Sequence, residues 1–258
     1  MKFYQVLSFL KYYLLKVNQH SLHNPLIYDL YTKLIKPLKN TPGITSIEDI
    51  RKELIHNNRE ISFSDYGAKG TSEKRSRKIN EISKSSLSSP WKSMILLSMG
   101  KYFNAKNIYE LGTSLGLNTL YLSSISESKV TTYEGGEEIA NIAQDNFSRL
   151  HRNNIRIIIG DLHETLAPSI NTINKVDLVF FDANHRYQPT LEYFNLFRNK
   201  IHEKTIFVFD DIHWSKEMSQ AWEEIKKSVE VTLSIDLYYF GIVLFDPTLT
   251  KQHYILSS

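Results

Sequence analysis

The sequence predicts an α/β fold whose sheet has seven strands, most of them parallel. Short apolar runs rich in β-branched residues alternate with amphipathic stretches of helical period, which implies parallel strands joined by right-handed crossovers. The last two apolar runs, Val231–Leu237 and Gly241–Phe245, lie too close together for a helix between them. They should therefore form a C-terminal antiparallel hairpin.

The chain has 258 residues, enough for one α/β domain with an appended segment. Ser88-Ser89-Pro90 is typical of a helix start, because proline is favoured in the first turn. We therefore expect an N-terminal helical cap over residues 1–88 and a main domain over residues 89–258. Helices are expected in the cap at 2–16, 24–37 and 45–57, followed by a loop-like stretch at 63–72 and a basic run at 74–78.

The first helix of the main domain should span residues 91–103 and lead into the first strand. In the N-terminal cap, Ser46 is a candidate N-cap for the helix expected at 45–57, because it precedes the acidic pair at 48–49. The remaining strands and helices of the main domain follow in alternation. The expected strands are 106–111, 129–134, 155–160, 176–182 and 205–210, and the expected helices are 116–127, 136–151, 162–169, 187–199 and 215–228.

Composition and charge exclude some functions. The chain has no cysteine, so disulfides, thiolate zinc sites and a cysteine nucleophile are excluded. No apolar run reaches the roughly 18 residues of a spanning helix, and no signal peptide is apparent, so we expect a cytoplasmic protein. Residues 1–100 carry 16 Lys and Arg against 8 Asp and Glu, whereas residues 101–258 carry 15 against 20. The basic front segment suits an acidic substrate, an anionic membrane or nucleic acid, or is simply a solvated helical face.

A glycine turn follows the first strand of the main domain. Gly112 and Gly116 allow the backbone to pass close to a ligand, and the strand end and helix start offer N–H groups to an anionic group. Glu134 ends the next strand, about 20 residues on, where an acidic side chain suits the two hydroxyls of a ribose. This pattern points to a cofactor that contains a nucleoside, and hence to an enzyme.

Together these units resemble the class I S-adenosylmethionine-dependent methyltransferases, whose fold is Rossmann-like. The Gly112-x-x-x-Gly116 spacing departs from the Gly-x-Gly-x-x-Gly fingerprint of dinucleotide sites. The stretch from Glu110 to Thr119 resembles the first motif of the catechol-type, metal-dependent O-methyltransferases. Asp182-Ala-Asn-His185 stands where that family has Asp-Ala-Asp-Lys. Asp210-Asp-Ile-His-Trp214 stands where it has Asp-Asn followed by Trp, and related macrolide and sugar O-methyltransferases carry Asp-Asp there.

The resemblance implies roles in binding S-adenosyl-L-methionine. The methionyl end would lie along the glycine turn, and Asn118 would meet the cofactor carboxylate. Glu134 would bind the ribose and Asp161 the adenine edge, although Asp161 is also placed to cap the following helix. Asp182 would contact the cofactor amine. The full set of expected cofactor-binding residues is Glu110, Gly112, Thr113, Gly116, Asn118, Glu134, Asp161 and Asp182.

The resemblance also implies catalytic and metal-binding residues. Asp182, Asp210 and Asp211 lie at the C-terminal ends of two strands expected to be neighbours, and their oxygens suit Mg²⁺. The alternative is that Asp182 and Asp210 cap loops or orient the cofactor. His185 replaces the family's lysine base, and an imidazole can accept a hydroxyl proton near neutral pH. His185 and Asp182 are therefore the expected catalytic residues, unless His185 only supports Asp182.

Weaker candidates flank this site. His213 and Trp214 could line the same pocket. Tyr187 could cover it, although a packing role is favoured. His20 and His23 have a spacing that can bind metal, but structural use is favoured. The loop at 67–72 with its basic neighbours could clamp an acidic substrate, although a solvated basic helix is favoured. These neighbours are Lys69, Arg75, Arg77 and Lys78.

The function predicted from these residues is O-methylation of a small molecule. An RNA or protein methyltransferase that uses the basic N-terminal segment is the alternative. The Asp-Pro-Pro-Tyr type of motif found in enzymes that methylate base amino groups is not present after the fourth strand, so nucleic acid is not favoured. A non-catalytic binding protein with the cofactor fold is the third possibility. The apolar run at 3–15 offers a face for a membrane surface or a partner, including a second copy of the chain.

Overall fold

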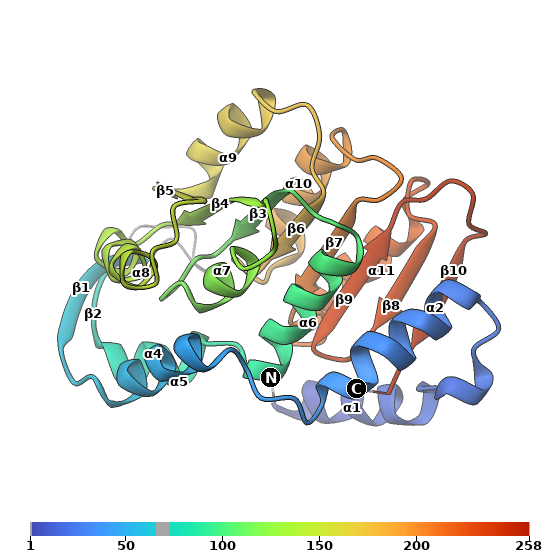
Figure 1. Ribbon diagram of the computed structural model, residues 1–258. Coiled ribbons are helices and arrows are strands. Elements are labelled where there is room, and N and C mark those ends of the chain that lie inside the picture. Colours follow the sequence, from blue (N-terminus) through green and yellow to red (C-terminus); the bar gives the residue numbers. More distant parts are fainter. Residues whose placement is uncertain (1, 66–72, 258) are drawn as a thin grey trace. The chain divides into compact units, whose positions relative to one another are not determined.

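The computed structural model describes residues 2–65 and 73–257. The chain divides into two compact units, one formed by residues 1–39 and 173–258 and the other by residues 40–172. Together the two units supply the eight strands of an α/β, Rossmann-like fold, and most of these strands run parallel (Figure 1). The fold class is the predicted one, with one strand more than expected.

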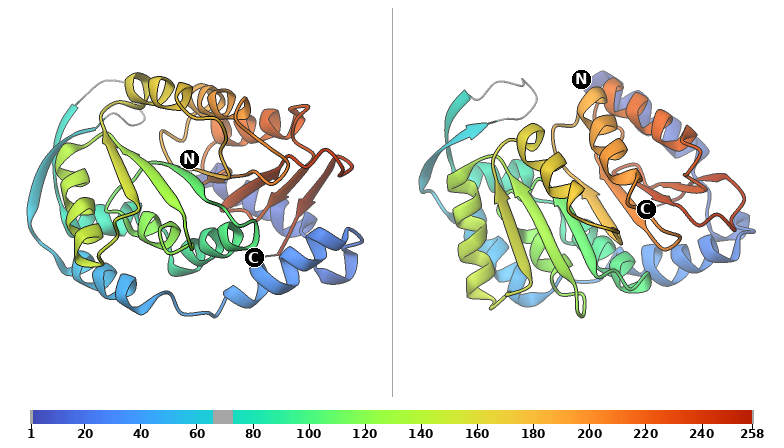
Figure 2. Two further views of the ribbon diagram at one scale, coloured as in Figure 1. Left: turned by 45° about the horizontal axis from the view of Figure 1, so that its top comes forward. Right: turned by 90° about the horizontal axis from the view of Figure 1, so that it is seen from above.

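The unit of residues 40–172 contains three parallel strands in the order β3-β4-β5 (Figure 2). The register pairs Glu110 on β3 with Thr132 on β4, and Glu134 at the end of β4 with Ile159 on β5. The large buried side chains Tyr121 and Phe147 come from helices α7 and α8. The elements are α4 (Thr45–His56), β1 (Glu60–Asp65), β2 (Glu73–Lys78), α5 (Ile79–Ser86), α6 (Pro90–Tyr102), β3 (Asn107–Leu111), α7 (Leu117–Leu122), β4 (Lys129–Glu134), α8 (Glu137–Arg149), β5 (Ile155–Ile159) and α9 (Leu162–Asn171).

A separate two-stranded sheet differs from the sequence prediction. β1 and β2 pair antiparallel, from Glu60 opposite Lys78 to Asp65 opposite Glu73. The sequence predicted only a loop and a basic run here, because β2 is almost entirely charged and shows no alternation of apolar residues. The predicted loop at 67–72, with Lys69, lies outside the described residues.

The unit of residues 1–39 and 173–258 contains five strands in the order β10-β8-β9-β7-β6. β6 and β7 run parallel, and β9 runs antiparallel to both β7 and β8, which confirms the predicted hairpin. The elements are α1 (Lys2–Leu15), the 3₁₀ helix η1 (Gln19–Ser21), α2 (Pro25–Asp29), the π-helical segment η2 (Leu30–Ile35), α3 (Lys36–Leu38), β6 (Leu178–Phe181), α10 (Tyr187–Arg198), β7 (Ile206–Asp210), α11 (Lys216–Lys227), β8 (Leu233–Asp236), β9 (Phe240–Leu244) and β10 (Gln252–Ile255).

In the eight-stranded sheet, β10 is the strand that the sequence pattern does not predict. It pairs parallel with β8, from Gln252 opposite Leu233 to Ile255 opposite Asp236. Only four residues long and partly polar, it has too short a pattern to be recognised from periodicity. The core of this unit is aromatic, and the rings of Phe181 and Phe209, on the adjacent strands β6 and β7, stack with centroids 4.3 Å apart.

Helix starts follow local chemistry where a capping side chain is available. Ser89 accepts the N–H of Lys92 at the start of α6, and Asn24 accepts the N–H of Leu26 at the start of α2, both just before a proline. The prediction that Ser46 caps α4 is wrong, because the helix begins at Thr45 and no side chain caps it. No helix in the described part of the chain has the length and apolar character to cross a membrane.

Candidate functional site

The glycine turn after β3 requires glycine at two positions. Gly112 has φ of 97° and Gly116 has φ of 83°, a left-handed conformation that other residues rarely adopt. A Cβ at Gly116 would lie 2.5 Å from the ring of Phe147 on α8. The N–H groups of Gly112 and Thr113 both donate to the carbonyl of Tyr133, which holds the turn against the end of β4.

A buried carboxylate lies under this turn. Glu110 is fully buried on β3, and its carboxylate accepts hydrogen bonds from the hydroxyls of Thr119 and Thr132. The bond from Thr132 measures 2.7 Å, and Thr132 also meets the hydroxyl of Thr113 at 2.6 Å. The strand register explains the bond between Glu110 and Thr132, because these two residues lie directly opposite each other on β3 and β4. Glu110 therefore ties together both strands, the turn and α7.

Glu134 is held in one orientation by the backbone. One carboxylate oxygen accepts the N–H of Ser114 at 2.8 Å, and the other accepts the N–H of Gly136 at 2.9 Å. Each carboxylate oxygen has a second lone pair, so this carboxylate can still accept from a diol. The hydroxyl of Ser114 is buried and has no hydrogen-bond partner among the described residues. A buried polar atom of this kind calls for a ligand or water, so the turn fits a polar ligand.

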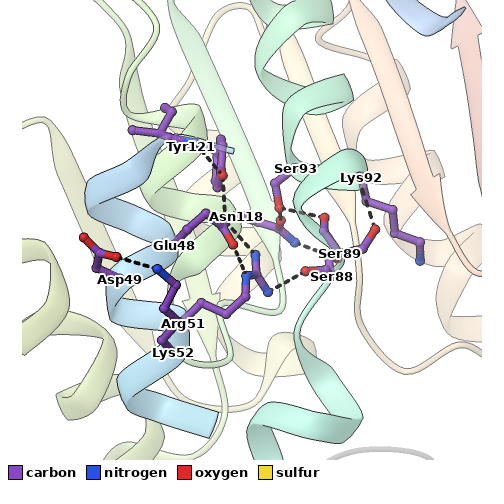
Figure 3. A network of polar contacts seen from close by, with 11 residues as sticks. Glu48, Asp49, Arg51, Lys52, Ser88, Ser89, Lys92, Ser93, Asn118 and Tyr121 are labelled. Carbon is purple, nitrogen blue, oxygen red and sulfur yellow. Dashed lines mark hydrogen bonds and ion pairs between the residues drawn. The ribbon is translucent and has the colours of Figure 1, made fainter. Parts of the chain in front are cut away.

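Asn118 lies on α7 and bonds to the start of α6 (Figure 3). Its side-chain amide donates to Ser88 at 3.1 Å, and its oxygen accepts from Ser93 at 2.6 Å. The structure therefore brings Asn118 together with two serines that sequence reasoning did not select. An amide has capacity for further bonds, so these contacts leave room for the predicted cofactor carboxylate.

Tyr121, one turn further along α7, joins this helix to α4 (Figure 3). Its hydroxyl donates to Glu48 at 2.7 Å and accepts the N–H of Ile44 at 3.0 Å. Glu48 also pairs with Arg51, and Arg51 donates to the carbonyl of Ser88 at 2.7 Å. Burial, followed by the hydrogen bond to Glu48, raises the pKa of Tyr121. This network fixes α7, and with it the helix start at the glycine turn.

Asp161 follows β5 and has the capping geometry considered as its alternative role. Its carboxylate accepts the N–H of His163 at 2.9 Å at the start of α9. Capping uses one of the carboxylate oxygens, so the two roles are compatible.

In the other unit, His185 and Asp182 form a pair after β6. The Nε2 atom of His185 lies 3.3 Å from a carboxylate oxygen of Asp182, and the histidine side chain is 29% exposed. Both Asn184 and His185 have positive φ, and so has Asp211, the residue that follows β7. Left-handed backbone at non-glycine residues costs free energy and is concentrated at functional sites. These outliers therefore mark the ends of β6 and β7 as a candidate site.

The charge environment of His185 is strongly acidic. Burial alone would lower its pKa, but the hydrogen bond and charge of Asp182 oppose this, with the charges of Asp210 and Asp211 adding to the effect. The net result raises the pKa of His185 to about 9. At neutral pH this imidazole is therefore mostly protonated, unlike the neutral base that an ordinary histidine would supply.

The predicted metal ligands do not form a recognisable metal centre. Within residues 2–65 and 73–257, no group of three His, Asp or Glu side chains is placed to hold a metal ion. Asp210 ends β7 and is buried, whereas Asp211 follows in left-handed backbone and Asp182 pairs with His185. The three aspartates therefore remain predicted ligands of Mg²⁺.

The secondary candidates have other contacts. His213 bonds to Asp236 at 2.7 Å and to Ser8 at 2.9 Å, so it links α1 to β8. The side chain of Trp214 is 45% exposed. Tyr187 is the first residue of α10, where its N–H donates to Glu217.

Three residues without a role predicted from the sequence also lie at the glycine turn. They are Ser114, Thr119 and Thr132. Thr132 can be found once the strand register is known, because it stands directly opposite Glu110. Ser114 is recognisable only from the left-handed backbone and burial of its hydroxyl.

Part of the chain is similar to a known protein family. Residues 109–212 match a family model described as a methyltransferase domain. This range begins on β3 and ends just after β7, so it covers the glycine turn, Glu134, Asp182, His185 and the aspartates Asp210 and Asp211 at the end of β7.

Solved structures share the fold. The O-methyltransferase from Bacillus cereus, in complex with SAH, is 18% identical, covers 84% of this chain and 99% of its own, and has a TM-score of 0.59. The SAH-bound methyltransferase PaMTH1 from Podospora anserina is 12% identical, covers 87% of this chain and 97% of its own, and has a TM-score of 0.63.

A curated relative is also found. The uncharacterized protein R132 of Acanthamoeba polyphaga mimivirus is 31% identical over 71 residues, or 26% of this chain. The chain spans about a third, 32%, of the length of that protein. Residues 109–212 are therefore similar to a methyltransferase domain, and the chain shares its fold with solved O-methyltransferases.

Proposed function

We propose that the chain transfers the methyl group of S-adenosylmethionine to a hydroxyl oxygen of a small molecule. One observation carries this proposal: Glu134, at the end of β4, is fixed by the backbone N–H groups of Ser114 and Gly136. A carboxylate anchored in this way is preorganised to accept two hydroxyl donors, as the ribose of the cofactor provides.

Most of the other proposed cofactor contacts lie in the same unit as Glu134, residues 40–172. Gly112 and Gly116 keep the turn free of side chains, and the buried hydroxyl of Ser114 gains a partner when a polar ligand binds. Asp161 and Asn118 remain the proposed contacts to the adenine and to the cofactor carboxylate. Asp182, in the other unit, remains the proposed contact to the cofactor amine.

S-adenosylmethionine, when bound, supplies an electrophilic methyl group on a sulfonium sulfur. We propose that His185 takes the proton that the acceptor hydroxyl loses, and that Asp182 orients the imidazole and stabilises its charged form. Only neutral His185 can accept this proton. Because its pKa is raised to about 9, the proposal predicts that turnover increases with pH across the neutral range.

Asp182, Asp210 and Asp211 stay the predicted ligands of Mg²⁺. Their test is turnover in EDTA: loss of turnover that Mg²⁺ restores would support the metal site, and unchanged turnover would contradict it.

The transfer itself is tested with methyl-labelled S-adenosylmethionine and a panel of phenols, catechols and aliphatic diols. The variants are His185→Gln and, as a matched control, His20→Gln, which changes an exposed histidine of the same unit. We expect label in an ether product with the wild type and the control, and at least about a 100-fold lower rate with His185→Gln. Equal rates in all three proteins would remove His185 from the mechanism, and transfer to amines alone would contradict O-methylation.

A further inference from the structure

Helix α1 presents an exposed apolar stripe that the proposed chemistry does not use. Phe3, Leu7, Leu10 and Leu14 recur at the spacing of one helix face, and Phe3 and Leu14 are 75% and 81% exposed. Val6 and Tyr13 widen this face on one side and are also exposed. An exposed apolar helix face of this width is typical of a surface that binds a protein partner or a membrane.

The opposite face of α1 anchors the helix to its own unit. The hydroxyl of Tyr12 donates to the carbonyl of Leu256 at 2.6 Å, and the hydroxyl of Tyr238 donates to the carbonyl of Gln5 at 3.0 Å. The side chain of Gln5 donates in turn to the carbonyl of Trp214. These bonds fix which side of α1 faces outward, so the apolar stripe stays exposed to solvent.

The charge around the stripe is of one sign. Helix α1 contains no acidic residue, and Lys11 is exposed one helical turn after Leu7, at the edge of the stripe. Lys16 follows the helix, with its ammonium 4.2 Å from the ring centre of Tyr13. Residues 1–39 contain six lysines and a single acid, Asp29. Such a segment is complementary to an anionic surface and repels a second copy of itself.

Exposed aromatic side chains lie next to α1 in the same unit. Trp214 and Tyr239 are 45% and 46% exposed, and the ring of Tyr239 packs edge-on against Tyr238, which in turn packs against Phe9 of α1. Tryptophan and tyrosine favour the boundary between lipid chains and headgroups, because one part of the ring system is apolar and the other polar.

From these observations we propose that α1 docks the protein onto an anionic lipid surface. The helix would lie in the plane of the interface, with its leucines and Phe3 among the upper acyl chains and its lysines at the headgroups. The proposal concerns residues of α1, none of which is among the proposed cofactor-binding or catalytic residues.

The test is co-sedimentation of the full chain with vesicles of equimolar phosphatidylcholine and phosphatidylserine, and with vesicles of phosphatidylcholine alone. The test variant is the double substitution Leu7→Gln and Leu14→Gln. The control is Val229→Gln, because Val229 is 87% exposed in the same unit but lies outside α1. Thermal melting establishes that each variant is folded.

We expect the wild type and Val229→Gln to bind the anionic vesicles at low salt, and the double variant to bind at least about tenfold more weakly. Lys11→Gln should weaken binding more at low salt than at high salt, because salt screens the attraction between the lysine and the anionic headgroups. Three results would overturn the proposal. One is no binding of the wild type, another is equal binding of all variants, and the third is a wild-type dimer that the double variant loses without any binding to vesicles.

Discussion

The carboxylate of Glu134 accepts the backbone N–H of Ser114 at 2.8 Å, which joins the tip of β4 to the glycine turn that follows β3. Twenty residues of chain separate the two, yet the parallel register of β3 and β4 brings them together. The contact makes Glu134 a fixed acceptor, and it places the buried hydroxyl of Ser114 at the same turn.

Replacing Gly116 should destabilise the protein. Its φ of 83° is strained for any other residue, and a new Cβ would lie 2.5 Å from the Phe147 ring. We expect Gly116→Ala to lower the free energy of unfolding by about 2–4 kcal/mol in urea titrations. Gly136→Ala is the control, since its φ is −88° and its new Cβ would come no closer than 3.2 Å. A loss at residue 116 no larger than that at 136 would contradict the steric account.

The hydroxyl of Tyr121 should contribute to stability as well. Tyr121→Phe leaves the N–H of Ile44 without its acceptor and removes the bond to Glu48, both partly buried. Urea unfolding should show a loss of about 1–3 kcal/mol. Tyr102→Phe, at a tyrosine that is 42% exposed, should change stability by less than about 0.5 kcal/mol. Equal effects would show that the network in Figure 3 is not what holds α7.

The charge state of His185 can be observed directly by NMR titration of its ring. We expect a pKa of about 9 in the wild type and a lower value in Asp182→Asn, because the hydrogen bond and the negative charge of Asp182 are lost together. A wild-type value near 6.5 would contradict the acidic environment described here.

The same shift predicts how stability depends on pH. A histidine whose pKa is higher in the folded than in the unfolded chain stabilises fully below the unfolded pKa, near 6.5, and this contribution disappears as pH rises through about 9. The contribution is on the order of 3 kcal/mol. Urea unfolding of wild type and His185→Gln should therefore differ more in mildly acidic than in alkaline buffer. A pH-independent difference would contradict the linkage.

The sequence predicted those parts of the fold that rest on local pattern. Glu134 was expected at a strand tip and lies there, and the Ser89-Pro90 helix start is confirmed. The strand β2 was missed, since a charged edge strand has no apolar period, and Ser46 was chosen as a cap although Ile44 precedes the helix.

Site properties that depend on several elements could not be predicted. The pKa of His185 depends on Asp210 and Asp211, which come from a different strand end, and burial is known only once the chain is folded. The orientation of Asn118 likewise depends on Ser88 and Ser93, which precede it by a whole strand and helix. Both are consequences of tertiary packing that a motif does not record.

The central claim is that Glu134 is part of a cofactor site, and calorimetric titration with S-adenosylhomocysteine tests it most directly. Wild type and Glu138→Gln, which changes an exposed glutamate on the next helix, should bind alike. Glu134→Gln should bind about 10- to 100-fold more weakly, because a charged acceptor of two hydroxyls is lost. Equal affinity of all three proteins, or no binding to the wild type, would contradict the account.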